Sequence, residues 1–496
     1  MNTKKLVKNA IYNSSSWGIN AIIAFFITPF LVLKLTVEGY GVYALITGLI
    51  GFYGLLDLDL GRAVTKFVAH YNAENNIRAI HESINAALII QLIIGVSGSI
   101  VLFLFSKNII LLLHITKSYF NDAYIGIHIV AFSFLLNLLT ATFLSALNGL
   151  QLYNITSKIE ILNNLVLNIL ILVLLILGYG LIEIFISYLV SSIVNFIINL
   201  VIVKTKFPKW NIFIKVSIKR IKELFGFGSY MVIARTSNLF SNYLTKYLVG
   251  FILGPAAVTF YVVPNKILAV IGGVLSNAFT VIFPFASDLN AREDFTKIKK
   301  LFSISVKIFI SLSLPLFLFT IVFSKEILSL WISKQFAIDS WQLLSLLSIS
   351  GFIGSLSTVP NNILLGLGKT RILGLFALLT LSIYIITFYV MPSIFGLLGV
   401  GIAFVLSTIP GIILMFLTIK NIIKLNFYII LRDILSLPLI MLVLFYILVF
   451  SLKIYANNLS ILLGGLTIAI SVVYYSILFF KNIPKTIKRV EFIKEM

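Results

Sequence analysis

The chain has 496 residues, of which 60% are hydrophobic and 11% charged, whereas soluble domains carry about 25% charged residues. Its formal net charge is +21, and it contains no cysteine and only four histidines. This composition excludes an ordinary soluble enzyme, and the lack of cysteine excludes disulfides and thiolate metal sites. The histidines are scattered, without a second histidine and a carboxylate at ligand spacing, so we expect no metal site.

Apolar blocks recur along the chain, each about as long as the 20 residues that an α-helix needs to cross a bilayer. A barrel strand needs only about 10 alternating residues, so the blocks predict an all-α polytopic membrane protein. The first block follows a basic start without a cleavage site and is expected to remain as a membrane span. About 14 transmembrane helices are expected, at residues 15–35, 40–60, 84–105, 123–146, 159–177, 181–203, 225–248, 257–284, 301–323, 340–363, 372–390, 396–417, 433–452 and 459–479.

The basic residues fall unequally on the two sides of this topology. With the N-terminus in the cytoplasm, 28 of the 38 Lys and Arg residues lie on the inner side and six on the outer side. This asymmetry follows the positive-inside rule, so both termini are expected in the cytoplasm and most of the charge needs no nucleic-acid partner. The inner segment 204–224 mixes basic and apolar residues. It is expected to lie on the membrane near anionic lipids as a surface helix, and a plain basic loop accounts for its charge equally well.

The first half of the chain resembles the second half in register. Gly54 falls on Gly272 and Asn20 on Asn238, an offset of 218 residues, and further on Gly149 meets Gly366. Each repeat holds an even number of spans, so the two halves enter the membrane in the same sense, as in transporters that bind substrate between two lobes. The expected domains are an N-terminal six-helix lobe at 1–203, the linker at 204–224, a C-terminal six-helix lobe at 225–417, and two extra transmembrane helices with a basic cytoplasmic tail at 418–496.

Two cations are expected at mid-depth in the second lobe. Arg235 lies about 15 Å from the inner end of its span near residue 225, and Lys266 about 14 Å from the outer end of its span near residue 257, so the two reach a similar level. A charge at the bilayer centre costs about 2.5–3.5 kcal/mol, so both side chains are expected to face a wet cavity. Their counterparts in the first half are Trp17 and Gly48, so the positive feature belongs to one lobe. Such a cavity suits a phosphate or diphosphate, because Arg presents a planar fork of donors and Lys a point charge.

Other polar residues lie on the same helix face as Arg235 or at the inner end of the second span. Asn238, Asn242 and Lys246 follow Arg235 at steps of 3, 4 and 4 residues and complete a helical stripe whose member Asn238 corresponds to Asn20. Asp57 and Asp59 end the second span beside Arg62 and are candidates for an inner gate or a coupling-ion site. Structural roles also fit these residues: ion pairing for Arg235, snorkelling for Lys246 and interhelical hydrogen bonds for the asparagines.

The stretches KKLVKNAIYNSSSWGINAIIAFFITPFLVLKLTVEGYGVYAL and LDLDLGRAVTKFVAHYNAENN carry a family resemblance. The chain resembles the polysaccharide-biosynthesis branch of the multidrug/oligosaccharidyl-lipid/polysaccharide exporter (MOP) superfamily, and within it the Wzx-type flippases of O-antigen or capsule repeat units. The resemblance implies two lobes around a V-shaped cavity, alternating access, and a lipid-linked oligosaccharide whose diphosphate meets the cavity cations. Arg235 and Lys266 are candidates for those cations by position.

We therefore expect a flippase of the bacterial inner membrane that moves undecaprenyl-diphosphate-linked repeat units to the outer leaflet and breaks no bond. A Na+ or H+ gradient or the membrane potential is expected to drive it, and a polysaccharide polymerase and a chain-length regulator are possible partners. A multidrug exporter of the same superfamily predicts acidic cavity residues, whereas a lipid II flippase shares the cationic cavity. A polysaccharide polymerase or ligase predicts a large outer domain, whereas the outer segments 106–122 and 324–339 are short.

Overall fold

The structure, a computed structural model, describes residues 3–51, 60–211, 216, 218, 220–224, 226, 244–423 and 443. The described residues are helical, joined by short turns, and include nine helical segments that are long and apolar enough to cross a membrane. The all-α, multi-pass fold predicted from the sequence is therefore confirmed. The expected spans 433–452 and 459–479 lie outside the described residues.

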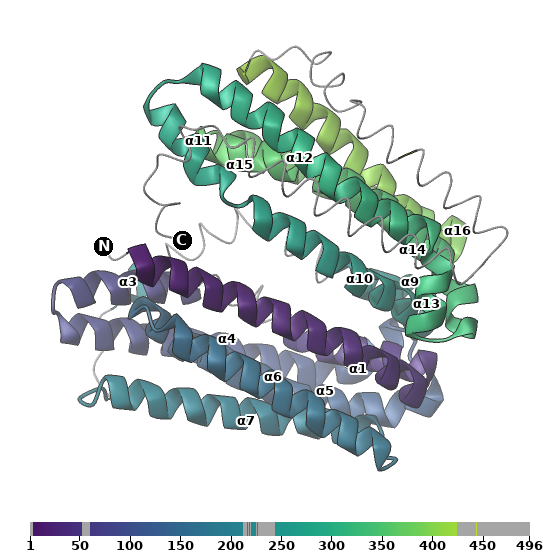
Figure 1. The fold of residues 1–496 in the computed structure, drawn as a ribbon. Helices are drawn as coiled ribbons and strands as arrows, with labels where there is room; N and C mark the ends of the chain where they lie inside the picture. The colour runs from purple at the N-terminus through teal and green to yellow at the C-terminus, as the bar shows by residue number, and fades with distance from the viewer. Residues whose placement is uncertain are drawn as a thin grey trace. The chain divides into compact units, whose positions relative to one another are not determined.

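The described chain forms two compact units, residues 1–259 and 260–496, and Figure 1 shows their helices. The first unit contains α1 (Thr3–Gly51), α3 (Leu60–Ala73), α4 (Ile77–Leu112), α5 (Lys117–Gly149), α6 (Tyr153–Ile176), α7 (Leu181–Lys206), α9 (Thr245–Leu253) and the start of α10 (Pro255–Phe279). The second unit contains the rest of α10, then α11 (Ile282–Ala291), α12 (Phe295–Val322), α13 (Ser324–Trp331), α14 (Lys334–Ser355), α15 (Thr358–Gly366) and α16 (Thr370–Ile423).

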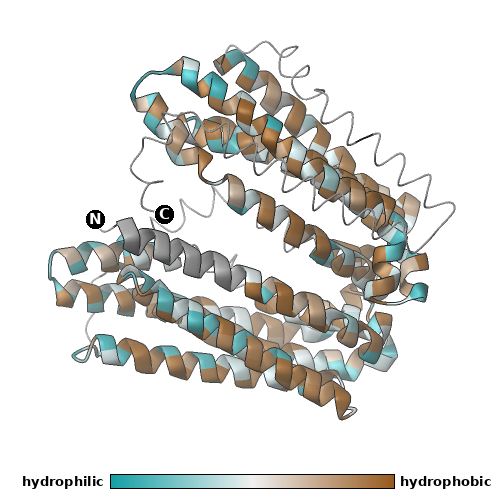
Figure 2. Cartoon of the chain, in the orientation of Figure 1, coloured by the Kyte–Doolittle hydropathy of each residue, from teal (hydrophilic) through white to brown (hydrophobic). Residues whose placement is uncertain are grey.

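Many apolar side chains point outward from the long helices, as a membrane environment requires. Figure 2 shows apolar residues along most of their length, with polar residues more frequent near the connection between α3 and α4. Leu104 is 72% exposed and Leu378 is 58% exposed. In water such surfaces would be unfavourable, whereas in lipid they face a solvent as apolar as themselves.

The turns repeat between the two halves of the chain. Positive φ angles occur at Thr36 and Gly254, and again at Asn75 and Glu293, each pair 218 residues apart. The helices after the second pair begin alike, because Asn76 caps α4 and Asp294 caps α12 through their side-chain oxygens. The register found in the sequence is thus repeated in the backbone and in the helix caps.

The segment after α7 packs on the first unit. Phe207, Trp210 and Leu224 are buried in an apolar cluster with residues of α3, α4 and α5. The Arg220 guanidinium lies 4.6 Å from the centre of the Tyr71 ring and donates a 2.5 Å hydrogen bond to the Tyr71 hydroxyl. The described part of the expected surface helix therefore uses its apolar residues against protein.

Candidate functional site

The predicted site residues divide into those the structure describes and those it does not. Asn20, Arg62 and Lys246 lie in the first unit and Lys266 in the second. Arg62 is exposed at the start of α3, and Lys266 is half-buried in α10. The remaining candidates lie outside the described residues: Arg235, Asn238, Asn242, Asp57 and Asp59. Their roles, like those of the described candidates, stay predictions.

Lys246 packs against α1. Its amine occupies the space beside Gly48, where a Cβ atom on that glycine would lie only 2.0 Å from Nζ. The amine also lies 5.5 Å from the centre of the Tyr247 ring, and the Tyr247 hydroxyl donates to the Leu45 carbonyl at 2.9 Å. Lys246 is therefore half-buried where α9 packs on α1.

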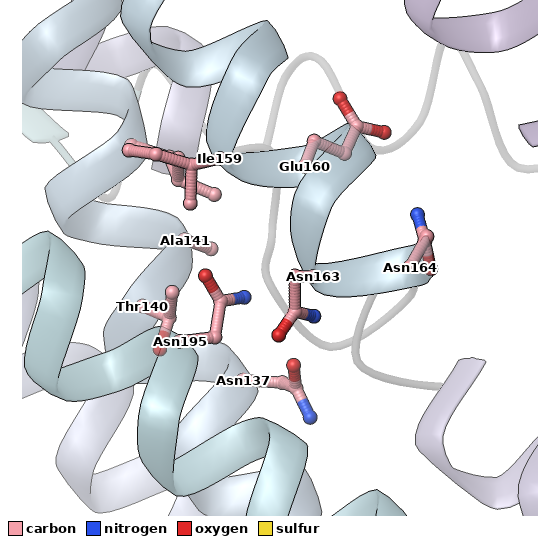
Figure 3. Close-up of a pocket in the computed structure, with 9 residues that line it drawn as sticks. Asn137, Thr140, Ala141, Ile159, Glu160, Asn163, Asn164 and Asn195 are labelled. Atoms are coloured by element: carbon pink, nitrogen blue, oxygen red, sulfur yellow. The ribbon is translucent and has the colours of Figure 1, made fainter. Parts of the chain in front are cut away.

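A polar cavity of about 250 Å³, which we call the amide cavity, lies among α5, α6 and α7. Figure 3 shows three asparagines, one from each helix, whose side chains point toward one another. They are Asn137 of α5, Asn163 of α6 and Asn195 of α7, and the remaining lining residues are Thr140, Ala141, Leu144, Ile159, Glu160 and Asn164. A lining this polar is unusual inside helices that are otherwise almost wholly apolar.

Hydrogen bonds fix which way two of these amides face. The Asn137 amide nitrogen donates to the Ser133 carbonyl at 2.7 Å and to the Ser192 hydroxyl at 3.0 Å. The Asn199 amide nitrogen donates to the Asn195 side-chain oxygen at 2.8 Å. The same nitrogen donates to the Asn195 backbone carbonyl, also at 2.8 Å, and this bond fixes its orientation. Because backbone carbonyls only accept, Asn137 keeps its oxygen and Asn195 its amide nitrogen for other contacts.

A carboxylate links this cavity to α1. The Asn20 amide donates to the Glu160 carboxylate at 3.4 Å, and Glu160 is exposed at the cavity edge. Asn20, predicted from the repeat stripe, thus lies beside the amide cavity. Within the described residues, no group of three or more His, Asp or Glu side chains gathers as a metal site would require.

The three asparagines lie at one level. Asn163 is ten residues from the start of α6 at Tyr153, and Asn137 and Asn195 are 12 and 11 residues from the ends of α5 and α7. These ends are on the cytoplasmic side in the predicted topology. At a rise of 1.5 Å per residue the asparagines are about 15–18 Å deep, which is near the middle of the bilayer.

The amide cavity was not predicted from the sequence. Its signal was present as Glu160, Asn163, Asn164 and Asn168 within an apolar span, and Figure 2 shows polar positions along α6. Periodicity places such residues on a helix, but it does not say which helices converge around them.

Solved structures show the class to which this fold belongs. A structure titled as the lipid II flippase MurJ in an inward closed conformation matches with a TM-score of 0.72 and 16% identity, over 94% of this chain and 99% of that one. An inward-facing multidrug resistance MATE family transporter of the MOP superfamily matches with a TM-score of 0.63 and 15% identity, over 84% and 94%. The protein therefore has the multi-pass membrane fold of these two structures.

The family follows from the sequence comparisons. The model of the family described as "Polysaccharide biosynthesis protein" matches residues 6–290, more than half of the chain. A protein of Shigella flexneri named as an O-antigen transporter is 24% identical over 417 residues, covering 83% of this chain and 96% of the relative. The chain belongs to the polysaccharide biosynthesis protein family.

Proposed function

We propose that this protein is a flippase that moves undecaprenyl-diphosphate-linked oligosaccharide repeat units from the inner to the outer leaflet of the bacterial inner membrane by alternating access. The observation that carries the proposal is the match along nearly the whole length of a relative named as an O-antigen transporter. In this function the sugar headgroup crosses through a hydrated route while the polyprenyl tail stays in lipid, and no covalent bond changes.

Lys246 and Lys266 support an anionic substrate. Both lie in apolar helices and both are half-buried, so a cation in either place is costly unless water or an anion reaches it. A lipid diphosphate offers oxygens for a lysine amine and for Arg235, the candidate outside the described residues. Anionic lipids, a polymerase and a chain-length regulator are proposed partners, with an ion gradient or the membrane potential as the driving force.

The test is surface polysaccharide made by a bacterial host that lacks its own repeat-unit flippase. We expect the wild-type chain to restore it, and Lys266→Met or Arg235→Met to lower it at least tenfold, because a hydrogen bond to a charged group contributes about 1.5–3 kcal/mol. The matched control is Lys325→Met, which removes an exposed lysine of α13 in the second unit. Full export by both site variants at equal expression would contradict the proposed role of these cations.

Lipid II is a second candidate substrate, favoured by the extent of the structural match to the lipid II flippase. Both substrates carry a diphosphate, so cation variants do not separate them. Complementation does: growth of a strain depleted of its lipid II flippase would assign lipid II, whereas restored surface polysaccharide alone would assign the oligosaccharide repeat unit.

A further inference from the structure

We propose that the amide cavity binds one sugar ring of the transported headgroup. This inference rests on the proposed function and adds a location and a chemistry to it: a neutral, hydroxyl-bearing ring held among α5, α6 and α7. Nothing in the cation hypothesis above uses these residues, so the two ideas can fail separately.

The cavity offers both donors and acceptors. Asn137 keeps a side-chain oxygen as an acceptor because its amide nitrogen is already engaged. Asn195 keeps its amide nitrogen as a donor because its oxygen accepts from Asn199. The Asn163 oxygen accepts from the Ser191 hydroxyl at 3.1 Å, which leaves its amide nitrogen as a second donor. Sugar hydroxyls both donate and accept, so they match this mixed set.

The same set is a poor site for a metal cation. Hard cations are held by several converging oxygens, and an N–H group directed at the ion opposes binding. Two of the three central asparagines offer N–H groups, and the carboxylate of Glu160 points away from them in Figure 3. The chemistry of the cavity therefore favours a hydroxyl-rich ligand over a bound ion.

The second half of the chain lacks these groups. Gln151 and Gly368 both have a positive φ angle and occupy equivalent turns in the two halves. At the offset between them, Glu160 corresponds to Ala377 and Asn163 to Thr380. Asn195 corresponds to Gly411 where Ser191 meets Ser407. A Cβ atom on Gly411 would lie 2.5 Å from the Thr380 hydroxyl. The two parts of α16, before and after its break at Gly396, therefore pack directly against each other at this point.

This difference between the halves argues against a purely structural role for the amides. Packing demands set by the fold would recur in both repeats, as the helix caps do. Amides in an apolar span also cost free energy unless they are paired. Their retention in one half, at mid-depth, indicates a ligand.

The volume limits what fits. At about 250 Å³, the cavity is slightly smaller than the roughly 300–1,000 Å³ of typical small-molecule sites. It therefore suits a single ring, with the rest of the oligosaccharide lying elsewhere.

The natural absence of cysteine allows a direct test. Ala141→Cys places a single thiol in the cavity wall, and its reaction rate with a methanethiosulfonate reagent is measured in proteoliposomes. Undecaprenyl diphosphate bearing one N-acetylhexosamine is expected to slow the reaction about fivefold or more, the effect of about one hydrogen bond. Bare undecaprenyl diphosphate and Na+ are expected to leave the rate unchanged. Equal protection by the bare lipid, or protection by Na+ alone, would overturn the proposal.

An isosteric variant separates a sugar site from a cation site without a change in volume. Asn163→Asp replaces an N–H donor by an acceptor, so we expect the protection by the sugar-bearing lipid to be lost. If the cavity held a cation, Na+ would already protect the thiol, and the added carboxylate would strengthen that protection. The control is Asn168→Asp on the same helix, whose amide bonds the Asn164 carbonyl and which does not line the cavity; we expect it to keep wild-type protection.

The labelling does not depend on transport. If the protein moves no lipid-linked sugar at all, the proposed function fails, and protection of the same thiol by free N-acetylhexosamine at high concentration still decides whether the cavity is a sugar site. If transport is normal and no sugar protects the thiol, the sugar-site inference alone is wrong.

Discussion

At the scale of single residues, Asn85 ties the segment after α7 to the first unit. It is 1% exposed, accepts a 2.9 Å hydrogen bond from the Trp210 indole nitrogen, and donates one of 2.9 Å to the Asn211 carbonyl. The Trp210 indole nitrogen is buried as well, so Asn85 orients a donor that has no water as an alternative.

Asn85→Ala is expected to lower the free energy of unfolding by about 1–3 kcal/mol, because it leaves the buried indole N–H of Trp210 without its acceptor. Thermal unfolding in detergent, followed by size-exclusion chromatography, measures the loss. Trp210→Phe removes one bond of the pair, so the double variant is expected to lose less than the sum of the two single losses. Additive losses would show that the two side chains do not act together.

A second residue, Asp294, gives the first turn of α12 a pH dependence. Its carboxylate accepts from the Lys297 backbone at 3.0 Å and pairs with the Lys297 amine at 2.6 Å. These hydrogen bonds, the one with the lysine side chain foremost, lower the pKa of Asp294. A depressed pKa means that the stabilisation is complete above the usual aspartate pKa of about 4 and is lost as the pH falls further.

Asp294→Asn keeps the cap and removes the charge. We expect the variant to be slightly less stable than the wild type near neutral pH and to show a smaller loss of stability below about pH 4. Melting temperatures measured across this range test the prediction. Parallel curves for the two proteins would mean that Asp294 has the same pKa folded and unfolded.

At the scale of elements, the second half of α1 lies in close contact with the stretch that runs from α9 into α10. A Cβ atom on Gly41 would lie 1.9 Å from the Pro255 carbonyl oxygen, and Thr259 donates a 2.5 Å hydrogen bond to the Val37 carbonyl. Gly250 faces Leu45 on the same seam, with its Cβ position 3.1 Å from the leucine side chain. Only glycine permits backbones to approach this closely.

Gly41→Ala is expected to separate these helices, since a backbone oxygen cannot move aside as a flexible side chain does. The reporter is cross-linking between Leu45→Cys and Val258→Cys in the cysteine-free chain, two positions whose side chains both lie against Gly250, and we expect this cross-linking to fall at least fivefold. Gly18→Ala in the same helix has no atom within 4 Å of its Cβ position and serves as the control. Undiminished cross-linking with Gly41→Ala would mean that the seam adapts to the added methyl group.

At the scale of the whole molecule, hydropathy and the repeat were sufficient to predict much of the fold. The break inside α1 at Thr36 falls between the expected spans 15–35 and 40–60, and the break inside α16 at Gly396 falls at the expected start of a span. Both follow from block length and turn residues, which are local properties. The count of 14 spans extends beyond the described residues.

The amide cavity was not predictable in the same way. Asn137, Asn163 and Asn195 are far apart in the sequence, and they meet only because α5, α6 and α7 pack side by side. The anchoring of Trp210 on Asn85 was missed for the same reason: amphipathic periodicity shows that one face is apolar and does not say whether lipid or protein covers it. Contacts between distant segments are decided by packing, which a single sequence does not reveal.

The burial of Phe207, Trp210 and Leu224 has a practical consequence for expressing the protein as two co-produced fragments. A cut before Phe207 would leave the first fragment with an uncovered apolar surface on α3 to α5. It would also give the second fragment an apolar N-terminal segment with nothing to cover it. A cut beyond Leu224 keeps these three residues in the first fragment, packed on α3 to α5. A split protein should therefore be divided after Leu224.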